Sequence, residues 1–260
     1  MPTVTVLEKL YGSCSPATFE ELYSNLISGL NVQLHFAGTT DSGWIKLDVS
    51  GDDKTAALSL LDREVGLAPA SLDGLEKFSV MRGKIVFSGK SESELYVDLG
   101  VVSLETCDAV LSENQLRAQL ADGRELSLKR LVELFCLYDN VPLEVKIAKK
   151  VGADSKNVEA VLSERQLSLF RSWVRCRFDR LLILGSLFSD VEQAVNSSRH
   201  SRDIIRTESL GVLEQIVLCK LGTDAVGLIP KLGRYLKSAV LAPFSPKKIL
   251  KAVGSQSFDW

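Results

Sequence analysis

Hydrophobic positions in the first 70 residues switch between the period of a strand and that of a helix. Val4 and Val6 alternate with polar residues and predict a strand that stops at Gly12. Ser15 is a favoured N-cap residue, and it precedes Pro16, a residue favoured at the first helical position. The other expected elements are a helix over 16–29, a hairpin of strands over 32–36 and 45–49, and a second helix over 53–64.

Residues 78–150 have a different pattern, in which short apolar runs are broken by glycines. The expected elements are strands over 81–87, 94–99, 108–111 and 143–147, and one helix over 127–137. This order resembles an oligonucleotide-binding (OB-fold) or S1-like barrel. Such barrels bind single strands through exposed aromatic side chains and a basic groove. The segment is acidic, however, so a barrel that only docks another protein is an open alternative. The candidate aromatic residues are Phe78, Phe87, Tyr96, Phe135 and Tyr138.

The last part of the chain returns to mixed strands and helices. Two Ser-x-x-Gln/Glu patterns, at 163–166 and 189–192, are expected capping boxes that open helices. Ser245 before Pro246 marks the start of a short basic helix. The other expected elements are strands over 158–162, 180–184, 204–208 and 213–218, and a helix over 233–240. Residues 4–65 and 180–240 can both be written β-α-β-β-α, either through internal duplication or by chance.

These patterns together predict an α+β protein of three small domains, in which two β-α-β-β-α domains flank a central OB/S1-like β-barrel. The expected boundaries are an N-terminal α/β domain over 1–70, the barrel over 76–150, and a basic C-terminal α/β domain over 156–260. The first linker is expected over 67–74, where small residues, proline and glycine gather.

Charge is divided unevenly along the chain. Residues 1–164 carry 16 Lys and Arg against 25 Asp and Glu, a net charge of −9. Residues 165–251 carry 15 against 7, a net charge of +8. The formal net charge of −2 for the whole chain therefore hides an acidic front and a basic back. Such an asymmetry favours an anionic partner such as nucleic acid.

Composition excludes several classes of protein. The 45% of hydrophobic and 25% of charged residues are typical of a globular protein, and no apolar run approaches the 18 residues of a membrane span. The N-terminus lacks the pattern of a signal peptide, so we expect a cytoplasmic location. The five cysteines include no C-x-x-C pair, which predicts reduced thiols and no zinc site.

The basic residues of the C-terminal part are the candidate nucleic-acid-binding residues. Arginine and lysine bind phosphate, and arginine can form two parallel hydrogen bonds to it. Pairing with the acidic half of the chain or with a partner protein is the alternative. The candidates are Arg165, Arg171, Arg175, Arg177, Arg199, His200, Arg202, Arg206, Lys231, Arg234, Lys237, Lys247 and Lys248.

A glycine-containing segment between a strand and a helix is a possible phosphate loop, because its amide groups can meet a phosphate at the helix N-terminus. Its residues are Lys220, Gly222, Thr223, Asp224 and Gly227. The glycine spacing is not that of a dinucleotide-binding motif, so glycines that only permit turns are the alternative. Nucleophile-elbow, metalloprotease and P-loop motifs are also absent from the sequence. No catalytic residue, cofactor or metal is therefore predicted.

Three stretches carry a family resemblance: residues 219–233, residues 1–12 and the turn Asp41-Ser42-Gly43-Trp44. Together they resemble an archaeal family of domains of unknown function, number twenty-one ten. The resemblance covers the whole chain and is most specific over 219–233. It implies an archaeal cytoplasmic protein and brings no catalytic residue with it.

The first functional hypothesis is a non-enzymatic RNA-binding protein linked to archaeal transcription or translation. Its phosphate contacts would come from the basic C-terminal face, and its acidic half would meet a protein or ribonucleoprotein. The second is a protein–protein adaptor without a role in nucleic-acid binding. The third is an enzyme or sensor for a phosphorylated small molecule at Gly222–Gly233.

Overall fold

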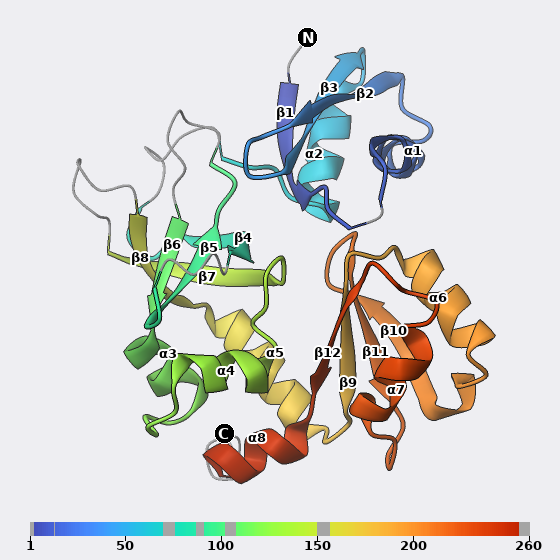
Figure 1. Ribbon diagram of the computed structural model, residues 1–260. Coiled ribbons are helices and arrows are strands. Elements are labelled where there is room, and N and C mark those ends of the chain that lie inside the picture. Colours follow the sequence, from blue (N-terminus) through green and yellow to red (C-terminus); the bar gives the residue numbers. More distant parts are fainter. Residues whose placement is uncertain are drawn as a thin grey trace.

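A computed structural model describes residues 3–12, 14–69, 76–86, 91–101, 108–149 and 157–254. The described residues form three sheets, one of them a closed barrel (Figure 1). In Figure 1 the N-terminal domain lies at the top, the barrel at the left and the C-terminal sheet at the right. The predicted α+β class with a central barrel is confirmed.

The N-terminal domain has the predicted β-α-β-β-α order. Its elements are β1 (Thr3–Lys9), α1 (Pro16–Leu26), β2 (Val32–Thr39), β3 (Trp44–Gly51) and α2 (Lys54–Glu64). The sheet has the order β1-β3-β2, with both pairings antiparallel. Ser15 caps α1 as predicted, because its hydroxyl accepts a hydrogen bond from the Thr18 backbone N–H. Phe19 and Tyr23 of α1 and Leu61 of α2 pack on the sheet.

The barrel consists of five strands. Its elements are β4 (Val80–Val86), β5 (Glu94–Asp98), β6 (Asp108–Ser112), α3 (Glu113–Leu120), α4 (Leu128–Phe135), β7 (Pro142–Lys149) and β8 (Asn157–Leu162). The closed order is β4-β5-β6-β8-β7, in which β6 and β8 run parallel and all other neighbours are antiparallel. Five strands in this order, with helices between the third and fourth, agree with the OB-type barrel predicted from the sequence.

Two sequence predictions for this region need correction. The strand over 157–162 closes the barrel beside β6, whereas its sequence position suggested that it opens the C-terminal domain. Helix α3 was not predicted, although it carries the complete capping box between Ser112 and Gln115. Residues 87–90 and 150–156, which include Phe87, lie outside the described residues, as do residues 70–74 of the predicted first linker.

The C-terminal part contains α5 (Glu164–Arg175), β9 (Arg180–Leu184), α6 (Phe188–Ser197), the short 3-10 helix η1 (Ser201–Asp203), β10 (Ile204–Ser209), β11 (Glu214–Cys219), α7 (Ala225–Leu232), β12 (Val240–Phe244) and α8 (Pro246–Val253). The sheet order is β10-β11-β9-β12. The helix predicted over 233–240 is wrong, because α7 precedes it and β12 begins at Val240. The capping box predicted at Ser189 is also wrong, because the N-cap of α6 is Leu187, two residues earlier, and the helix begins at Phe188.

The two flanking domains share one topology. In both, the first and second strands pair antiparallel with the third, as β1-β3-β2 and as β9-β11-β10. Leu67 follows α2 and bridges to Val6 of β1, just as β12 follows α7 and pairs with β9. Gly12 and Gly185, which follow the first strand of each domain, lie against each other at positive φ angles of 71° and 91°. The shared β-α-β-β-α plan proposed from the sequence is therefore present in the fold.

The barrel and the C-terminal sheet share one hydrophobic core. Leu182, Ile216 and Phe244 of the sheet belong to the same buried cluster as the barrel interior and α5. Phe244 packs edge-to-face against Trp173 of α5, with ring centroids 5.2 Å apart. Helices α6 and α7 cover the other face of the sheet. These two domains are therefore expected to unfold as one unit, whereas the N-terminal domain packs around a separate cluster that Leu213 of the C-terminal part also enters.

Candidate nucleic-acid interface

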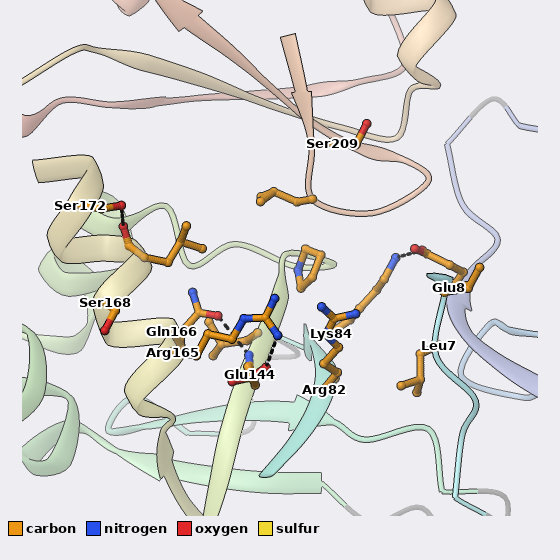
Figure 2. A pocket seen from close by; sticks show the side chains of 16 residues that line it. Leu7, Glu8, Arg82, Lys84, Glu144, Arg165, Gln166, Ser168, Ser172 and Ser209 are labelled. Atoms are coloured by element: carbon orange, nitrogen blue, oxygen red, sulfur yellow. Dashed lines mark hydrogen bonds and ion pairs between the residues drawn. The ribbon is translucent and has the colours of Figure 1, made fainter. Parts of the chain in front are cut away.

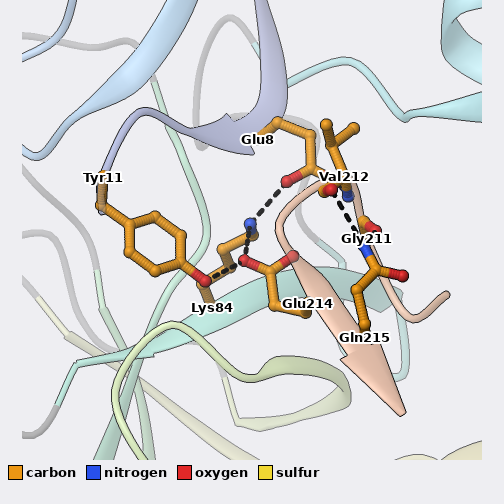
Figure 3. A network of polar contacts seen from close by, with 7 residues as sticks. All are labelled: Glu8, Tyr11, Lys84, Gly211, Val212, Glu214 and Gln215. Carbon is orange, nitrogen blue, oxygen red and sulfur yellow. Dashed lines mark hydrogen bonds and ion pairs between the residues drawn. The ribbon is translucent and has the colours of Figure 1, made fainter. Parts of the chain in front are cut away.

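A buried polar network lies where the three domains meet (Figure 3). Lys84 of β4 places its Nζ 2.5 Å from Glu8 Oε2 of β1 and 2.7 Å from Glu214 Oε1 of β11. All three side chains are at most 6% exposed. The Tyr11 hydroxyl donates to the same Glu214 oxygen. One lysine of the barrel therefore joins both flanking domains.

A second buried ion pair joins β1 to the barrel. Lys9 Nζ lies 2.8 Å from Asp98 Oδ2, and the indole N–H of Trp44 donates to the same oxygen at 2.8 Å. The backbone N–H of Gly100 donates to the other oxygen of Asp98 at 2.9 Å. Every oxygen of this carboxylate is thus bonded, which is the condition for burying a charge without a large penalty.

A cleft of about 510 Å³ opens beside the Lys84 network and is walled by all three domains (Figure 2). Leu7 and Glu8 come from the N-terminal domain, and Ser209 comes from the end of β10. The barrel and α5 supply the remaining walls, with Arg82 on β4 and Arg165 on α5. The cleft volume lies within the range of ordinary small-molecule sites.

The two arginines of the cleft are available for an anion. Arg82 is exposed and has no ion-pair partner among the described residues. Arg165 approaches Glu144 only to 3.8 Å, and its side chain is 77% exposed, so this pair is weak. Glu144 is anchored elsewhere, because the Ser163 hydroxyl donates to it at 2.6 Å. Both guanidinium groups can therefore turn to a phosphate.

Phe78 extends this surface along the outside of the barrel. It is 60% exposed, and its backbone has a φ of 76°, a conformation that bulky side chains rarely adopt. Lys77 Nζ and Lys146 Nζ lie over its ring at 4.9 and 5.3 Å from the centroid. An exposed aromatic ring between two cations is the kind of site that stacks a base next to bound phosphates.

The register of β4 and β7 connects Phe78 to the cleft. Val80 lies opposite Lys146, and Arg82 lies opposite Glu144. Alternate residues of a strand share a face, so positions 80, 82 and 84 follow one another on the outer side of β4. The strip runs from Phe78 along these positions of β4 to Arg165 in the cleft. We call it the β4 face.

The candidate residues from the sequence are divided between two sides of the C-terminal sheet. Helix α5 and the helix α8 packed against it carry one set, beside the barrel. Only Arg165 of that set reaches the cleft. The second set follows η1, β10 and α7 at the other side of the sheet. The first set is Arg165, Arg171, Arg175, Arg177, Lys247 and Lys248, and the second is Arg199, His200, Arg202, Arg206, Lys231, Arg234 and Lys237.

The geometry gives the predicted phosphate loop no support. Asp224 caps α7 by accepting from the Val226 backbone N–H at 3.0 Å. Asp179 Oδ2 accepts from the Ala225 backbone N–H at 3.4 Å. The amide groups that a phosphate would need are thus occupied by two carboxylates, which would also repel it.

His200 is held by a neighbouring carboxylate. Its Nδ1 lies 2.7 Å from Asp203 Oδ2, and this hydrogen bond, with the positive charges of Lys231 and Lys220 nearby, lowers the pKa of Asp203. This surface pair has no nucleophile bonded to the free ring nitrogen among the described residues, so it supports anion binding better than catalysis.

Two of the described cysteines, Cys136 and Cys219, are buried. Burial raises the pKa of Cys136 and of Cys219 to about 12, which leaves both thiols protonated and unreactive at neutral pH. Within the described ranges, no group of three His, Cys, Asp or Glu side chains could hold a metal ion. No helix found there has the length and apolar character needed to cross a membrane.

Fold and site together define a three-domain α+β protein built around a five-stranded barrel. Family models for the DUF2110 N-terminal domain and the DUF2110 C-terminal domain match residues 3–70 and 178–243. The chain therefore belongs to the DUF2110 family, and the two matched regions are the two domains of shared topology. A search of curated proteins finds no significant match.

Sequence reasoning missed the residues at the centre of this site. Lys84, Arg82 and Glu8 were not singled out, and Phe78 was named only as one of five barrel aromatics. A signal was present, because Glu8 continues the apolar alternation of Val4 and Val6 with a charged residue. A carboxylate on the buried face of a strand indicates a buried partner.

Proposed function

We propose that the protein is a non-enzymatic, RNA-binding protein that holds a single strand along the β4 face and in the adjoining cleft. The observation that carries this proposal is the continuity between Phe78, which is exposed between two lysines, and the arginines of the cleft. Base stacking on an aromatic ring and phosphate contacts to cations are the usual means of binding single strands. The barrel topology supports the same class of ligand.

The outer side of β5 and β6 is less suited to this ligand. It presents Tyr96, but the Tyr96 hydroxyl donates to Glu94 at 2.7 Å, and Glu159 of β8 lies exposed beside Val110. Carboxylates repel phosphates. The β4 and β7 face carries Glu144, but Lys77, Arg82, Lys146 and Arg165 outnumber it there, so we place the strand on this face and not on the one that OB-type barrels commonly use. The basic residues of the C-terminal domain then attract the RNA from a distance.

The proposal extends to an archaeal, cytoplasmic protein linked to transcription or translation. The basis for the origin and location is the resemblance that the sequence carries, and the basis for a place beside a ribonucleoprotein is the proposed RNA site on a barrel between two charged flanking domains. The N-terminal domain, in which residues 1–70 carry four Lys and Arg against nine Asp and Glu, is available for a basic protein partner.

Fluorescence anisotropy tests the proposal with the full chain and a labelled 12-nucleotide oligouridine. Four phosphate contacts, from Lys77, Arg82, Lys146 and Arg165, give a log–log salt slope of about −3 for a single strand. The affinity should then fall roughly 50-fold between 50 and 200 mM salt. Absence of binding at 50 mM salt would contradict the proposal, and equal binding of the deoxy strand would remove the preference for RNA.

Matched variants localise the site. Phe78→Ala should weaken binding by about 5- to 150-fold, the usual effect of removing one stacking ring. Tyr235→Ala is its control, because Tyr235 is also exposed (52%) but lies on the C-terminal domain. Arg165→Glu should weaken binding more than Lys247→Glu, which makes the same change of charge on α8. Equal effects of a variant and its control would place the RNA elsewhere.

A phosphorylated small molecule is the second candidate, because the cleft volume of about 510 Å³ fits one. Competition by uridine monophosphate for the labelled oligonucleotide distinguishes a small-molecule site from an RNA site. Complete displacement of the oligonucleotide by micromolar nucleotide, together with a thermal shift, would favour the small ligand. Displacement only at millimolar concentration is the result expected for a strand bound over several positions.

A further inference from the structure

We propose that the Lys84 network is a proton-dependent latch, in which one proton on its carboxylates keeps the three domains assembled and its loss loosens their junction. This inference does not depend on what the cleft binds. It starts from the charges of the network: one lysine faces two carboxylates, Glu8 and Glu214, and all three are buried. With both carboxylates ionised, the junction would carry one uncompensated negative charge.

Among the residues that the structure describes, Lys84 is the one cation that acts on Glu214. Tyr11 packs against it from the segment after β1, and Tyr23 of α1 lies near both carboxylates. Lys9, the neighbouring cation of β1, is paired with Asp98 on the other side of the strand. The groups that face Glu214 are therefore two tyrosines, a carboxylate and Lys84, and a proton is the remaining means of reaching neutrality.

The two carboxylate oxygens that do not contact Lys84, Glu214 Oε2 and Glu8 Oε1, meet at Gly211. Glu214 Oε2 is buried and has no hydrogen-bond partner. A Cβ atom at Gly211 would lie 2.1 Å from this oxygen and 2.9 Å from Glu8 Oε1. Glu8 Oε1 accepts only from the Val212 backbone N–H, at 3.0 Å. Two carboxylate oxygens beside one glycine repel each other when both groups are ionised, and protonation of one group removes that repulsion.

Electrostatics agree with this geometry. Burial raises the pKa of Glu214 to about 7, because desolvation and the charge of Glu8 outweigh the stabilising charge of Lys84. Burial lowers the pKa of Lys84, but the two carboxylates more than compensate, so Lys84 stays charged. Burial and the nearby Glu214 and Glu8 charges raise the pKa of Tyr11, which therefore remains a hydrogen-bond donor.

The direction of the effect follows from linkage. A carboxyl with a higher pKa in the assembled than in the separated state takes up a proton on assembly. Assembly is then fully favoured below the ordinary glutamate pKa and weakens as the pH rises from 4.5 to about 7. Glu8 and Lys84 also line the cleft, so a looser junction changes the walls of the cleft.

Thermal unfolding and small-angle X-ray scattering of the full chain between pH 5.5 and 8.5 test the latch. We expect the melting temperature to fall and the radius of gyration to rise as the pH increases. Glu214→Gln, which imitates the protonated carboxyl, should make both quantities independent of pH over this range. Glu133→Gln, on the exposed face of α4, is the control and should behave like the native chain.

Each outcome decides the proposal. A Glu214→Gln variant with the native pH dependence, or a native chain with no pH dependence, would overturn it. If Glu214→Gln does not fold, Glu8→Gln removes the same excess charge from the N-terminal side and should also abolish the pH dependence. Retention of the pH dependence in Glu8→Gln would overturn the latch. Both results are independent of whether the chain binds oligouridine.

Discussion

Replacement of Lys84 by methionine should strongly destabilise the folded chain at pH 7.5. The substitution keeps much of the side-chain volume and removes the only cation of the described part of the chain within bonding distance of Glu8 and Glu214. Loss of one partner of a buried ion pair costs about 3–5 kcal/mol, because the remaining charges stay buried and unpaired. For a cooperative unit of this size, the melting temperature should fall by roughly 10 °C.

The shared core makes this loss measurable as global stability. Lys84 belongs to the barrel and Glu214 to the C-terminal sheet, and the two domains unfold as one unit if their common cluster is cooperative. Chemical denaturation followed by tryptophan fluorescence is a suitable assay, since Trp173 lies in that cluster. Lys129→Met on the exposed side of α4 is the control, expected within about 0.5 kcal/mol of the native chain.

A compensated variant separates lost charge balance from lost packing. Combining Lys84→Met with Glu8→Gln and Glu214→Gln leaves no buried charge in the network, so at least half of the lost stability should return. The reasoning would be refuted by a Lys84→Met variant that loses less than about 1 kcal/mol, the typical value for an exposed pair. It would also fail if the triple variant were no more stable than the single one.

Three further substitutions test individual contacts by chemical denaturation. Gly211→Ala should lower the free energy of unfolding, since the added Cβ would overlap Glu214 Oε2. In Gly227→Ala the added Cβ in α7 meets no atom, so this variant should raise the free energy of unfolding by about 0.5–1 kcal/mol. Equal effects of the two would contradict the close approach at Gly211. Trp44→Phe removes a bond to the Asp98 carboxylate and should cost about 1.5–3 kcal/mol. Asp224→Ala removes the cap of α7 and should cost about 1 kcal/mol, so an unchanged midpoint would argue against that cap.

Short-range signals in the sequence predict the local elements well. Ser15 and Ser163 cap the helices that follow them, because the bond that the backbone N–H three residues on donates to the hydroxyl depends on local geometry alone. The prediction of the start of α6 is wrong because a tertiary contact, and not local sequence, decides where the helix begins. Leu187 packs against the N-terminal core and becomes the N-cap without any side-chain bond, which leaves Ser189 inside the helix.

Long-range contacts explain why the site could be predicted only in part. Lys84 is 76 residues from Glu8 and 130 residues from Glu214, so no local pattern links them. Gln166 illustrates the same limit: its side chain accepts from the Glu144 backbone N–H, although its spacing from Ser163 suggests a capping box. Arg165 lies in a basic stretch that is visible in the sequence, whereas Arg82 and Glu8 of the same cleft come from other domains.

Photo-crosslinking of the full chain to 4-thiouridine-containing oligonucleotide, read by mass spectrometry of the digested complex, tests the central claim most directly. The account predicts crosslinked peptides that contain Phe78 and Arg82, and others that contain Arg165. Their yield should fall in Phe78→Ala and stay unchanged in Tyr235→Ala. Crosslinks confined to α8 or to the segment from Arg199 to Lys237, with none on β4 or α5, would contradict an RNA site in the cleft between the three domains.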